Sequence, residues 1–298
     1  MTMGEMIPIR EVCKATGVNP VTLRAWERRY GLITPHRTEK GHRLYTEANI
    51  RQIQDILLWL SRGVTVSQVK PLLDSPIPEE NDLTSPWGAL RQTFLEAIIS
   101  FDVALLNQQI DRAFRLYSTA DLCINMLEPV LLQLQQRWQG QFGSQLEEVF
   151  CNSWLRTKLA VSLEQGNARS TSGPVILASL SDEHCEMGLW LLALMLSADG
   201  YNIDILEWNV PASELSLLSD QRLPAALVLF SSQALSAAQL RRQLPRLGQH
   251  LPNVLMMAGP AAMIHADELS ELDIHALPER ATLAYAALAG IMAAGPAI

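Results

Sequence analysis

The chain has 298 residues, with 31 Asp and Glu against 23 Lys and Arg, and a net charge of −8. Hydrophobic residues make up 48% and charged residues 18%, which excludes an intrinsically disordered chain. The length exceeds what one hydrophobic core usually organises, so several domains are expected. No apolar run is long enough to cross a bilayer and the first residues do not resemble a signal peptide, so we expect a cytoplasmic protein with no membrane partner.

The first predicted domain, residues 1–75, begins with two short helices separated by a glycine. The apolar spacing predicts a helix over residues 9–16 that ends at Gly17. Asn19 followed by Pro20 predicts the cap and first turn of the second helix. The apolar positions of that helix recur at helical spacing, and its other faces are cationic: Leu23, Trp26 and Tyr30 against Thr22, Arg24, Arg28 and Arg29.

A basic two-stranded ribbon that turns at Gly41 is predicted after this helix, followed by a third helix capped by Thr46 and a fourth that ends near Leu73. Its basic and aromatic side chains are Arg37, Lys40, His42, Arg43 and Tyr45. Residues 1–73 carry eleven Lys and Arg against six Asp and Glu, a local net charge of +5 in an acidic chain. A localised basic face is typical of a nucleic-acid-binding domain.

These motifs resemble the MerR family of transcription regulators over roughly residues 7–75. The resemblance is carried by the Thr-Leu-Arg, Gly-Leu, Pro-x-Arg and Gly-x-Arg-x-Tyr motifs at 22–24, 31–32, 35–37 and 41–45. It implies a winged helix-turn-helix that binds double-stranded operator DNA, with the helix in the major groove and the wing on phosphates. The contacts it implies, with the helix cap included, are Asn19, Thr22, Arg24, Arg28, Arg29, Arg37, Lys40, His42, Arg43 and Tyr45.

A proline-rich acidic linker over 76–86 separates this domain from a helical region over 87–166. Four helices are predicted there, near 87–99, 101–117, 119–140 and 145–165, and their short connections favour a four-helix bundle. Ser118 with Asp121 and Ser144 with Glu147 resemble capping boxes at two of the helix starts.

Residues 174–298 change to an alternation of apolar strands and helices. Strands are predicted over 175–179, 201–207, 226–230 and 254–258, with helices that include 187–197, 212–219 and 236–244. Continuous apolar strands with helical crossovers indicate a doubly wound, Rossmann-like α/β domain with a parallel sheet. Ligands bind such sheets at the carboxyl ends of the strands, so the loop after the first strand is the place to look.

That loop and the helices before it resemble the cobalamin-binding modules of some MerR-family regulators, which carry Asp or Glu, any residue, His, two residues and Gly. Here the Glu and Gly are kept and the ligand position holds Cys185. The positions that the resemblance assigns to the cofactor are Trp138, Glu148, Val149, Glu183, His184, Cys185, Gly188, Ser231, Ser232 and Gly259. His184, one residue from the ligand position, is a less favoured substitute for the missing ligand.

Both histidines that the resemblance assigns to cobalt are absent from their positions. Val149 has no lone pair to donate, and Cys185 can bind a metal only as a thiolate. We therefore expect the fold of the module without tight corrinoid binding, so that no cofactor is favoured and cobalamin is the alternative. The four cysteines are scattered without paired spacing, which argues against a disulfide framework or a metal site.

Two runs, Asn-Pro-Val-Thr-Leu-Arg-Ala-Trp at 19–26 and Gly-Val-x-Val-Ser-x-Val-Lys at 63–70, resemble enterobacterial regulators of curli, biofilm and blue-light responses. That subgroup implies a partner protein as input, docked on the C-terminal domains. We expect a homodimer on a palindromic operator, with repression favoured over activation. The alternatives are a cobalamin-dependent, light-responsive regulator and a corrinoid-binding enzyme component. No nucleophile with a base and no phosphate-binding glycine loop supports an enzyme.

Overall fold

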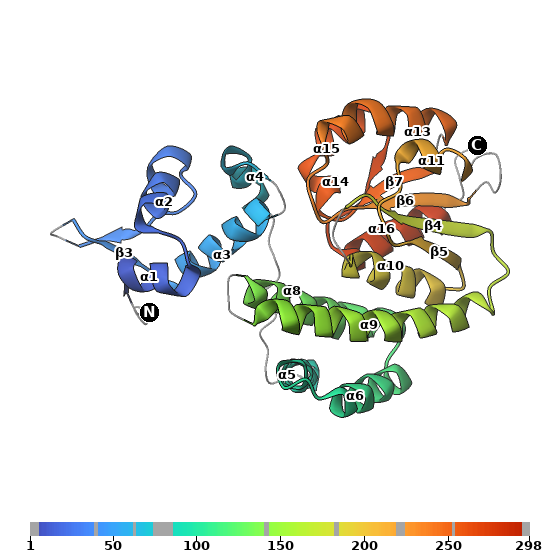
Figure 1. Ribbon diagram of the computed structural model, residues 1–298, viewed down its shortest axis with the longest axis horizontal. Helices are drawn as coiled ribbons and strands as arrows, with labels where there is room; N and C mark the ends of the chain where they lie inside the picture. Colours follow the sequence, from blue (N-terminus) through green and yellow to red (C-terminus); the bar gives the residue numbers. More distant parts are fainter. Residues whose placement is uncertain are drawn as a thin grey trace. The chain divides into compact units, whose positions relative to one another are not determined.

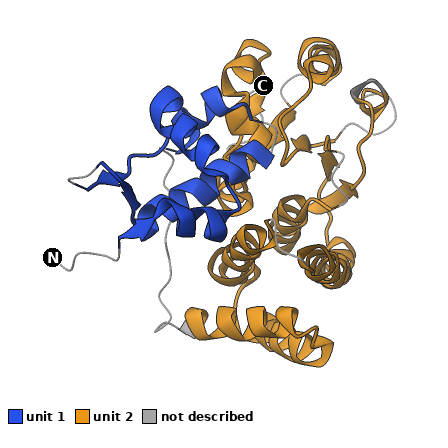
Figure 2. Ribbon diagram, turned by 60° about the vertical axis from the view of Figure 1, so that its left-hand side comes forward, with its two compact units in different colours: residues 1–80 blue, residues 81–298 orange. Residues whose placement is uncertain are grey.

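The structure, a computed structural model, describes residues 6–38, 41–61, 64–73, 86–139, 143–181, 185–218, 224–251 and 254–293. The chain divides into two compact units, Met1–Glu80 and Asn81–Ile298, which Figure 2 shows in different colours. Of the predicted linker 76–86, all but Pro86 lies outside the described residues. In the described parts of the chain, no helix combines the length and apolar character needed to span a membrane.

The N-terminal unit is mainly helical and contains a three-stranded antiparallel sheet in the order β1-β3-β2. Its elements are β1 (Ile7–Pro8), α1 (Ile9–Thr16), α2 (Pro20–Ala25), the π-helical turn η1 (Trp26–Tyr30), β2 (His36–Arg37), β3 (Arg43–Tyr45), α3 (Glu47–Ser61), the 3-10 turn η2 (Val66–Gln68) and α4 (Val69–Leu73). Gly17, which follows α1, adopts a φ of 72°, the left-handed region that favours glycine. The predicted order of helix, glycine turn and helix is confirmed.

One face of each long helix in this unit is buried. Val12 of α1, Leu23 of α2, Trp26 of η1, and Ile53 and Ile56 of α3 are at most 3% exposed. As predicted, Thr46 caps α3, its hydroxyl oxygen accepting from the Asn49 N–H at 3.3 Å. The amphipathic pattern therefore orients α2 and η1 so that Leu23 and Trp26 are inside and the arginines are outside.

The C-terminal unit begins with a helical region. Its elements are α5 (Pro86–Ile99), α6 (Val103–Leu116), α7 (Thr119–Leu122), the π-helical turn η3 (Cys123–Leu127), α8 (Glu128–Trp138) and α9 (Ser144–Asn167). The capping box at Ser118 is confirmed, because its hydroxyl accepts from the Asp121 N–H. The one at Ser144 is wrong: α9 begins after a left-handed Gly143 with no side-chain cap, and Glu147 bonds to α8 instead.

A five-stranded parallel sheet follows, in the order β5-β4-β6-β7-β8 (Figure 1). The strands are β4 (Pro174–Ser179), β5 (Asn202–Leu206), β6 (Ala226–Phe230), β7 (Leu255–Ala258) and β8 (His275–Ala276). The helices are α10 (Met187–Ala198), α11 (Ala212–Leu215), η4 (Gln239–Gln243), α13 (Leu244–His250), α14 (Pro260–Ile264), α15 (Ala266–Glu271) and α16 (Ala281–Ala293). The doubly wound sheet and its first four strands are confirmed, whereas the two-residue β8 is too short to leave a periodic signal.

Helices cover both faces of this sheet, so the strands are apolar on both sides. Val228 and Phe230 pack into a core shared with α10, α16 and the helical region, while Leu227 and Leu229 pack toward α11 and α13. On the first face, α10 and α16 lie between the sheet and α8 and α9 (Figure 1). This shared core explains why the helical region and the sheet form one compact unit.

A buried ion pair joins the same two parts. The Glu128 carboxylate of α8 accepts from Arg280 at 2.9 Å and from the Thr282 N–H at 3.2 Å, at the start of α16. The Thr282 hydroxyl donates to the same carboxylate. Glu128 is only 5% exposed, so its charge is neutralised by donors from one helix terminus.

Candidate functional site

The start of the second helix is fixed by its cap. The Asn19 side-chain oxygen accepts from the Thr22 N–H at 2.8 Å and from the Thr22 hydroxyl at 3.1 Å, and Pro20 occupies the first helical position. Asn19 is exposed and Thr22 is half-buried. The two predicted site residues are therefore hydrogen-bonded to each other at the N-terminus of the helix, and both are accessible to solvent.

Three arginines project from the continuous helix formed by α2 and η1. Arg24, Arg28 and Arg29 are exposed, while Leu23 and Trp26 on the opposite side are in the core. Within the described part of the chain, none of the three arginines forms a salt bridge. Guanidinium groups presented in this way are able to bind guanine edges or phosphates in a bidentate manner.

The hairpin that contains β2 and β3 is attached to this helix through Glu27. Arg37 and Arg43 contact the two carboxylate oxygens of Glu27 at 2.6 and 2.5 Å. Burial acts to raise the pKa of Glu27, but the hydrogen bonds and charges of Arg43 and Arg37 outweigh it and hold the pKa below its usual value. Sequence reasoning did not identify Glu27, because nothing in its spacing shows that it meets residues ten and sixteen positions later.

The two arginines of this cluster differ in exposure. The Arg43 side chain is 12% exposed and that of Arg37 is 50% exposed, so Arg43 is mainly an internal link and Arg37 keeps an open edge. His42 lies exposed on the hairpin, and Lys40 lies outside the described residues. Of these predicted ribbon contacts, Arg43 is therefore structural, whereas Arg37 and His42 are accessible.

Tyr45 is not available for a contact. Its side chain is 0% exposed, and its hydroxyl is buried without a hydrogen-bond partner in the described structure. Burial also raises the pKa of the phenol. The expectation that Tyr45 reaches a phosphate is corrected by this placement: alternation along β3 points the ring inward, and it serves as a core residue.

The second group of predicted site residues lies near the carboxyl edge of the parallel sheet. Trp138 is 8% exposed, and its indole N–H donates to Glu147 at 3.1 Å, while Arg137 donates to the same oxygen at 2.9 Å. Glu148 and Val149 are exposed on the next positions of α9. The hydrogen-bond partner of the Trp138 indole is therefore Glu147, the residue before the predicted site residue Glu148.

Cys185 is half-buried in the loop that leads to α10. Burial, followed by the negative charge of Glu207, raises the pKa of its thiol to about 12, although Arg156 acts in the opposite direction. The thiol is therefore protonated at neutral pH. Among the residues described, no three His, Cys, Asp or Glu side chains are placed to hold a metal ion. Glu183 and His184 lie outside the described residues.

The two predicted glycines accommodate a side chain of the protein itself. A Cβ at Gly188 would overlap the ring of Phe230, and a Cβ at Gly259 would lie 3.0 Å from the same ring and 2.8 Å from the Ser231 carbonyl oxygen. Gly259 also has a φ of 81°. Phe230 is only 3% exposed. The ring thus fills the space that the two glycines leave.

The predicted serines are also engaged internally. The Ser231 hydroxyl donates to the Gln233 carbonyl at 2.8 Å. Both the N–H and the hydroxyl of Ser232 donate to Glu186 at 2.9 Å. Glu186 is 4% exposed and was missed by sequence reasoning, because its serine partner is 46 residues away along the chain.

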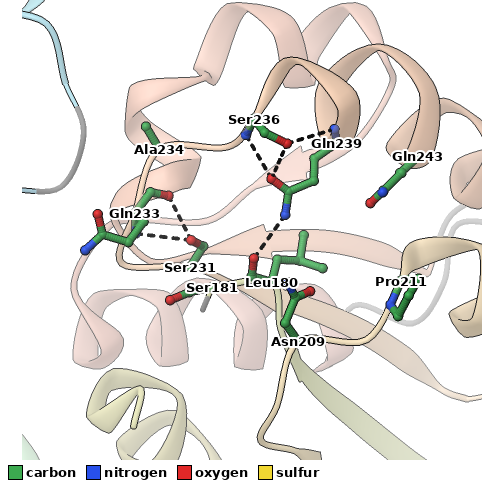
Figure 3. A pocket seen from close by; sticks show the side chains of 10 residues that line it. All are labelled: Leu180, Ser181, Asn209, Pro211, Ser231, Gln233, Ala234, Ser236, Gln239 and Gln243. Atoms are coloured by element: carbon green, nitrogen blue, oxygen red, sulfur yellow. Dashed lines mark hydrogen bonds between the residues drawn. The ribbon is translucent and has the colours of Figure 1, made fainter. Parts of the chain in front are cut away.

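A cavity of about 690 Å³ lies at the same edge of the sheet (Figure 3). Its lining residues follow β4, β5 and β6 and continue into η4: Leu180, Ser181, Asn209, Pro211, Ser231, Gln233, Ala234, Ser236, Gln239 and Gln243. Apart from Ser231, none of these was predicted as a site residue. The available signal was general, because the carboxyl edge of a doubly wound sheet is where ligands bind.

The fold thus combines an N-terminal helix-turn-helix unit, with exposed arginines on its second helix, and a C-terminal unit of helices and a parallel sheet. The description "MerR HTH family regulatory protein" matches residues 7–76, and "B12 binding domain" matches residues 90–162. The HTH-type transcriptional regulator MlrA of Salmonella typhimurium is 33% identical over 200 residues, which cover 66% of this chain and 78% of that protein. The chain therefore belongs to the MerR family of helix-turn-helix regulators and carries a B12-binding-type domain.

Two further similarities cover the C-terminal unit as well. The HTH-type transcriptional repressor CarH of Myxococcus xanthus is 27% identical over 279 residues, which cover 90% of this chain and 93% of that protein. The solved structure of a Methanosarcina barkeri monomethylamine corrinoid protein superposes with a TM-score of 0.52 at 16% identity, covering 68% of this chain and 99% of that chain. At that identity the superposition establishes the fold alone.

The described residues of this chain do not fit a corrinoid as the family pattern implies. Phe230 fills the glycine-lined space, Glu186 takes the hydrogen bonds of Ser232, and Val149 offers no donor atom. The protonated thiol of Cys185 is also a poor metal ligand. The fold of the B12-binding domain is present, but the side chains at the edge of its sheet pack against and hydrogen-bond one another.

Proposed function

We propose that this MerR-family regulator binds a palindromic operator as a homodimer. The observation that carries the proposal is the set of three exposed arginines without salt bridges, within the described residues, on α2 and η1. Eleven Lys and Arg against six Asp and Glu over residues 1–73 support electrostatic attraction to DNA. A helix with this dimension and charge fits the major groove, and a single small domain contacts too few base pairs for gene-level specificity.

The contacts divide into base reading and positioning. Arg24, Arg28 and Arg29 reach base edges or the adjacent phosphates, and Asn19 and Thr22 position the helix start. The hairpin acts as the wing: Arg37, Lys40 and His42 bind phosphates, while Arg43 holds the hairpin against Glu27. Tyr45 has no direct part, because it is buried.

The C-terminal unit serves as the input module of the proposed regulator, which we assign to repression. Its signal is a docking protein or a small ligand other than a corrinoid. The basis for this choice is the internal use of Glu186, Phe230 and Ser232 at the sheet edge. The alternative, a cobalamin-dependent and light-responsive regulator, is supported by the B12 binding domain match and opposed by the same side chains.

Selection of genomic fragments by the full-length protein tests the proposed DNA binding. Fragments retained in the presence of excess random DNA are expected to share a palindrome, with two protomers bound per site. Transcription from a promoter that contains the site is expected to fall when the protein is added. Retention of no fragment above random DNA would contradict operator binding, and increased transcription would replace repression by activation.

A further inference from the structure

The cavity beside β4, β5 and β6 lies where a doubly wound sheet reverses its strand order. The chain runs from β4 to β5 on one side and continues with β6 on the other, so the loops after β4 and β6 diverge and leave a crevice. The lining residues Leu180, Asn209 and Ser231 come from the three loops that follow these strands. At about 690 Å³, the cavity has the size of a small-molecule site.

The walls of the cavity are held in place by internal hydrogen bonds (Figure 3). The amide oxygen of Gln239 accepts from the Ser236 N–H and hydroxyl at 2.8 Å, and its amide nitrogen donates to the Leu180 carbonyl at 3.0 Å. On the other side of the cavity, the Ser231 hydroxyl donates to the Gln233 carbonyl oxygen and accepts from the Gln233 N–H. These bonds tie the loop after β4 to the helix after β6, so the cavity is formed before any ligand arrives.

The chemistry of the lining is polar and uncharged. Every described side chain that lines the cavity carries a hydroxyl or an amide, or belongs to one of the apolar residues Leu180, Pro211 and Ala234. The helix start at Ser236 is already capped by its own capping box, Ser236 with Gln239, which reduces its use as an anion site. Gln243, one turn further, is half-buried, and within the described residues its amide has no hydrogen-bond partner.

We infer that this cavity binds an uncharged, hydroxyl-bearing ring compound of nucleoside or disaccharide size. The Gln243 amide hydrogen-bonds the ligand, and Leu180, Pro211 and Ala234 contact its apolar parts. This inference deepens the proposed function, on which it rests, by naming the class of the input ligand. The site is separate from the space that Phe230 fills, because Phe230 packs into the core on the other face of the sheet.

Calorimetric titration of the full-length protein without DNA tests the inference. The probes are the four ribonucleosides, their 5′-monophosphates, and the disaccharides sucrose, maltose and trehalose. At least one neutral probe is expected to bind once per chain, and for a nucleoside the matching monophosphate is expected to bind about tenfold more weakly, since the described lining has no cation. Whether a nucleoside or a disaccharide binds then identifies the class of the ligand.

Two variants and one control locate the binding. Gln243→Leu removes the amide and is expected to weaken the neutral probe about tenfold, the effect of one hydrogen bond. Gln249→Leu makes the same change on an exposed position of α13 and is expected to bind as the wild type does. Ala234→Phe places a phenyl ring in the cavity and is expected to abolish binding by steric overlap with the ligand.

Failure of all neutral probes to bind at millimolar concentration would overturn the inference, as would a monophosphate that binds more tightly than its nucleoside. Equal affinity of wild type and Gln243→Leu would also overturn it. None of these results depends on operator binding, which is measured separately with DNA. Failure of the ligand site and failure of the proposed DNA binding are therefore distinguishable.

Discussion

The second helix of the helix-turn-helix unit and the buried carboxylates of the C-terminal unit use their charges in opposite ways. On that helix, Arg24, Arg28 and Arg29 are exposed and form no salt bridge within the described residues. In the C-terminal unit, Glu128, Glu147 and Glu186 are at most 8% exposed, and each accepts hydrogen bonds from its own chain.

The exposed arginines are available to a binding partner, whereas the buried carboxylates already have hydrogen-bond donors from within the protein. Exposed guanidinium groups keep their full capacity to bind phosphates or bases. Buried carboxylates whose lone pairs are filled stabilise the fold only as long as their donors remain. Retention of the B12-binding-type fold therefore does not by itself preserve the ligand of that fold.

Removal of a buried carboxylate is the largest effect expected. Glu128→Ala takes the carboxylate away from the partly buried Arg280 and from the buried Thr282, and it is expected to lower the free energy of unfolding by about 3–5 kcal/mol. Urea denaturation of the full-length protein measures this change. Glu164→Ala, on an exposed position of α9, is the control and should change it by less than about 0.5 kcal/mol. A decrease below about 1 kcal/mol for Glu128→Ala would contradict the described role of the ion pair.

Removal of an exposed arginine should affect binding and leave folding intact. Arg24→Ala is expected to weaken operator binding by about 1–3 kcal/mol per contacted base and to relax specificity there. Affinities for operator and random DNA, measured at one salt concentration, check this result. Lys14→Ala on α1 is the control, because that side chain is exposed and pairs with Glu11. An unchanged ratio between operator and random DNA would restrict Arg24 to a positioning role.

The pair that holds the hairpin should make its stability depend on pH. The pKa of Glu27 is lowered in the folded state, so its contribution is present above the unfolded pKa of about 4.3 and is lost as the pH falls through the folded value. Hydrogen exchange of peptides from residues 36–45, corrected for intrinsic rates, is expected to show this loss of protection on acidification. In Glu27→Gln the protection should be about 1 kcal/mol lower at neutral pH and nearly independent of pH.

The control for this experiment is Glu11→Gln, which removes an exposed carboxylate paired with Lys14. It is expected to leave exchange in residues 36–45 unchanged at every pH. If Glu27→Gln retains the acid-dependent loss of protection, another group controls the hairpin.

The smallest effect expected is on the salt dependence of binding. Arg28→Ala removes about one phosphate interaction per protomer, so the slope of log affinity against log salt should fall by about one unit for each phosphate that is no longer neutralised. Titrations between about 50 and 200 mM salt measure that slope. Arg43→Ala is the comparison: because this side chain holds Glu27, its removal should also reduce exchange protection of the hairpin. Equal slopes for Arg28→Ala and the wild type would show that Arg28 does not bind a phosphate.

Much of the architecture followed from local sequence signals. Asn19 with Pro20 indicated a helix start, Gly17 a turn, and continuous apolar runs the parallel strands. What escaped prediction were contacts between distant residues. The pairs of Glu27 with Arg43 and of Glu186 with Ser232 join positions 16 and 46 residues apart, and no periodicity encodes them.

Burial of individual side chains in short strands was equally hard to anticipate. Tyr45 in a three-residue strand faces either the core or solvent according to register alone, and a one-residue shift reverses the choice. The position of Phe230 between two glycines likewise depends on how three elements pack. Such features become visible only in three dimensions.

We infer that this regulator binds its operator without a corrinoid. The most direct measurement purifies the full-length protein in the dark from cells grown with cobalamin, records its visible absorption and cobalt content, and compares its operator affinity with that of protein from cobalamin-free cells. We expect no visible absorption band, no stoichiometric cobalt and the same affinity for both preparations. One corrinoid per chain, or an affinity that changes with corrinoid content, would instead establish a cofactor sensor.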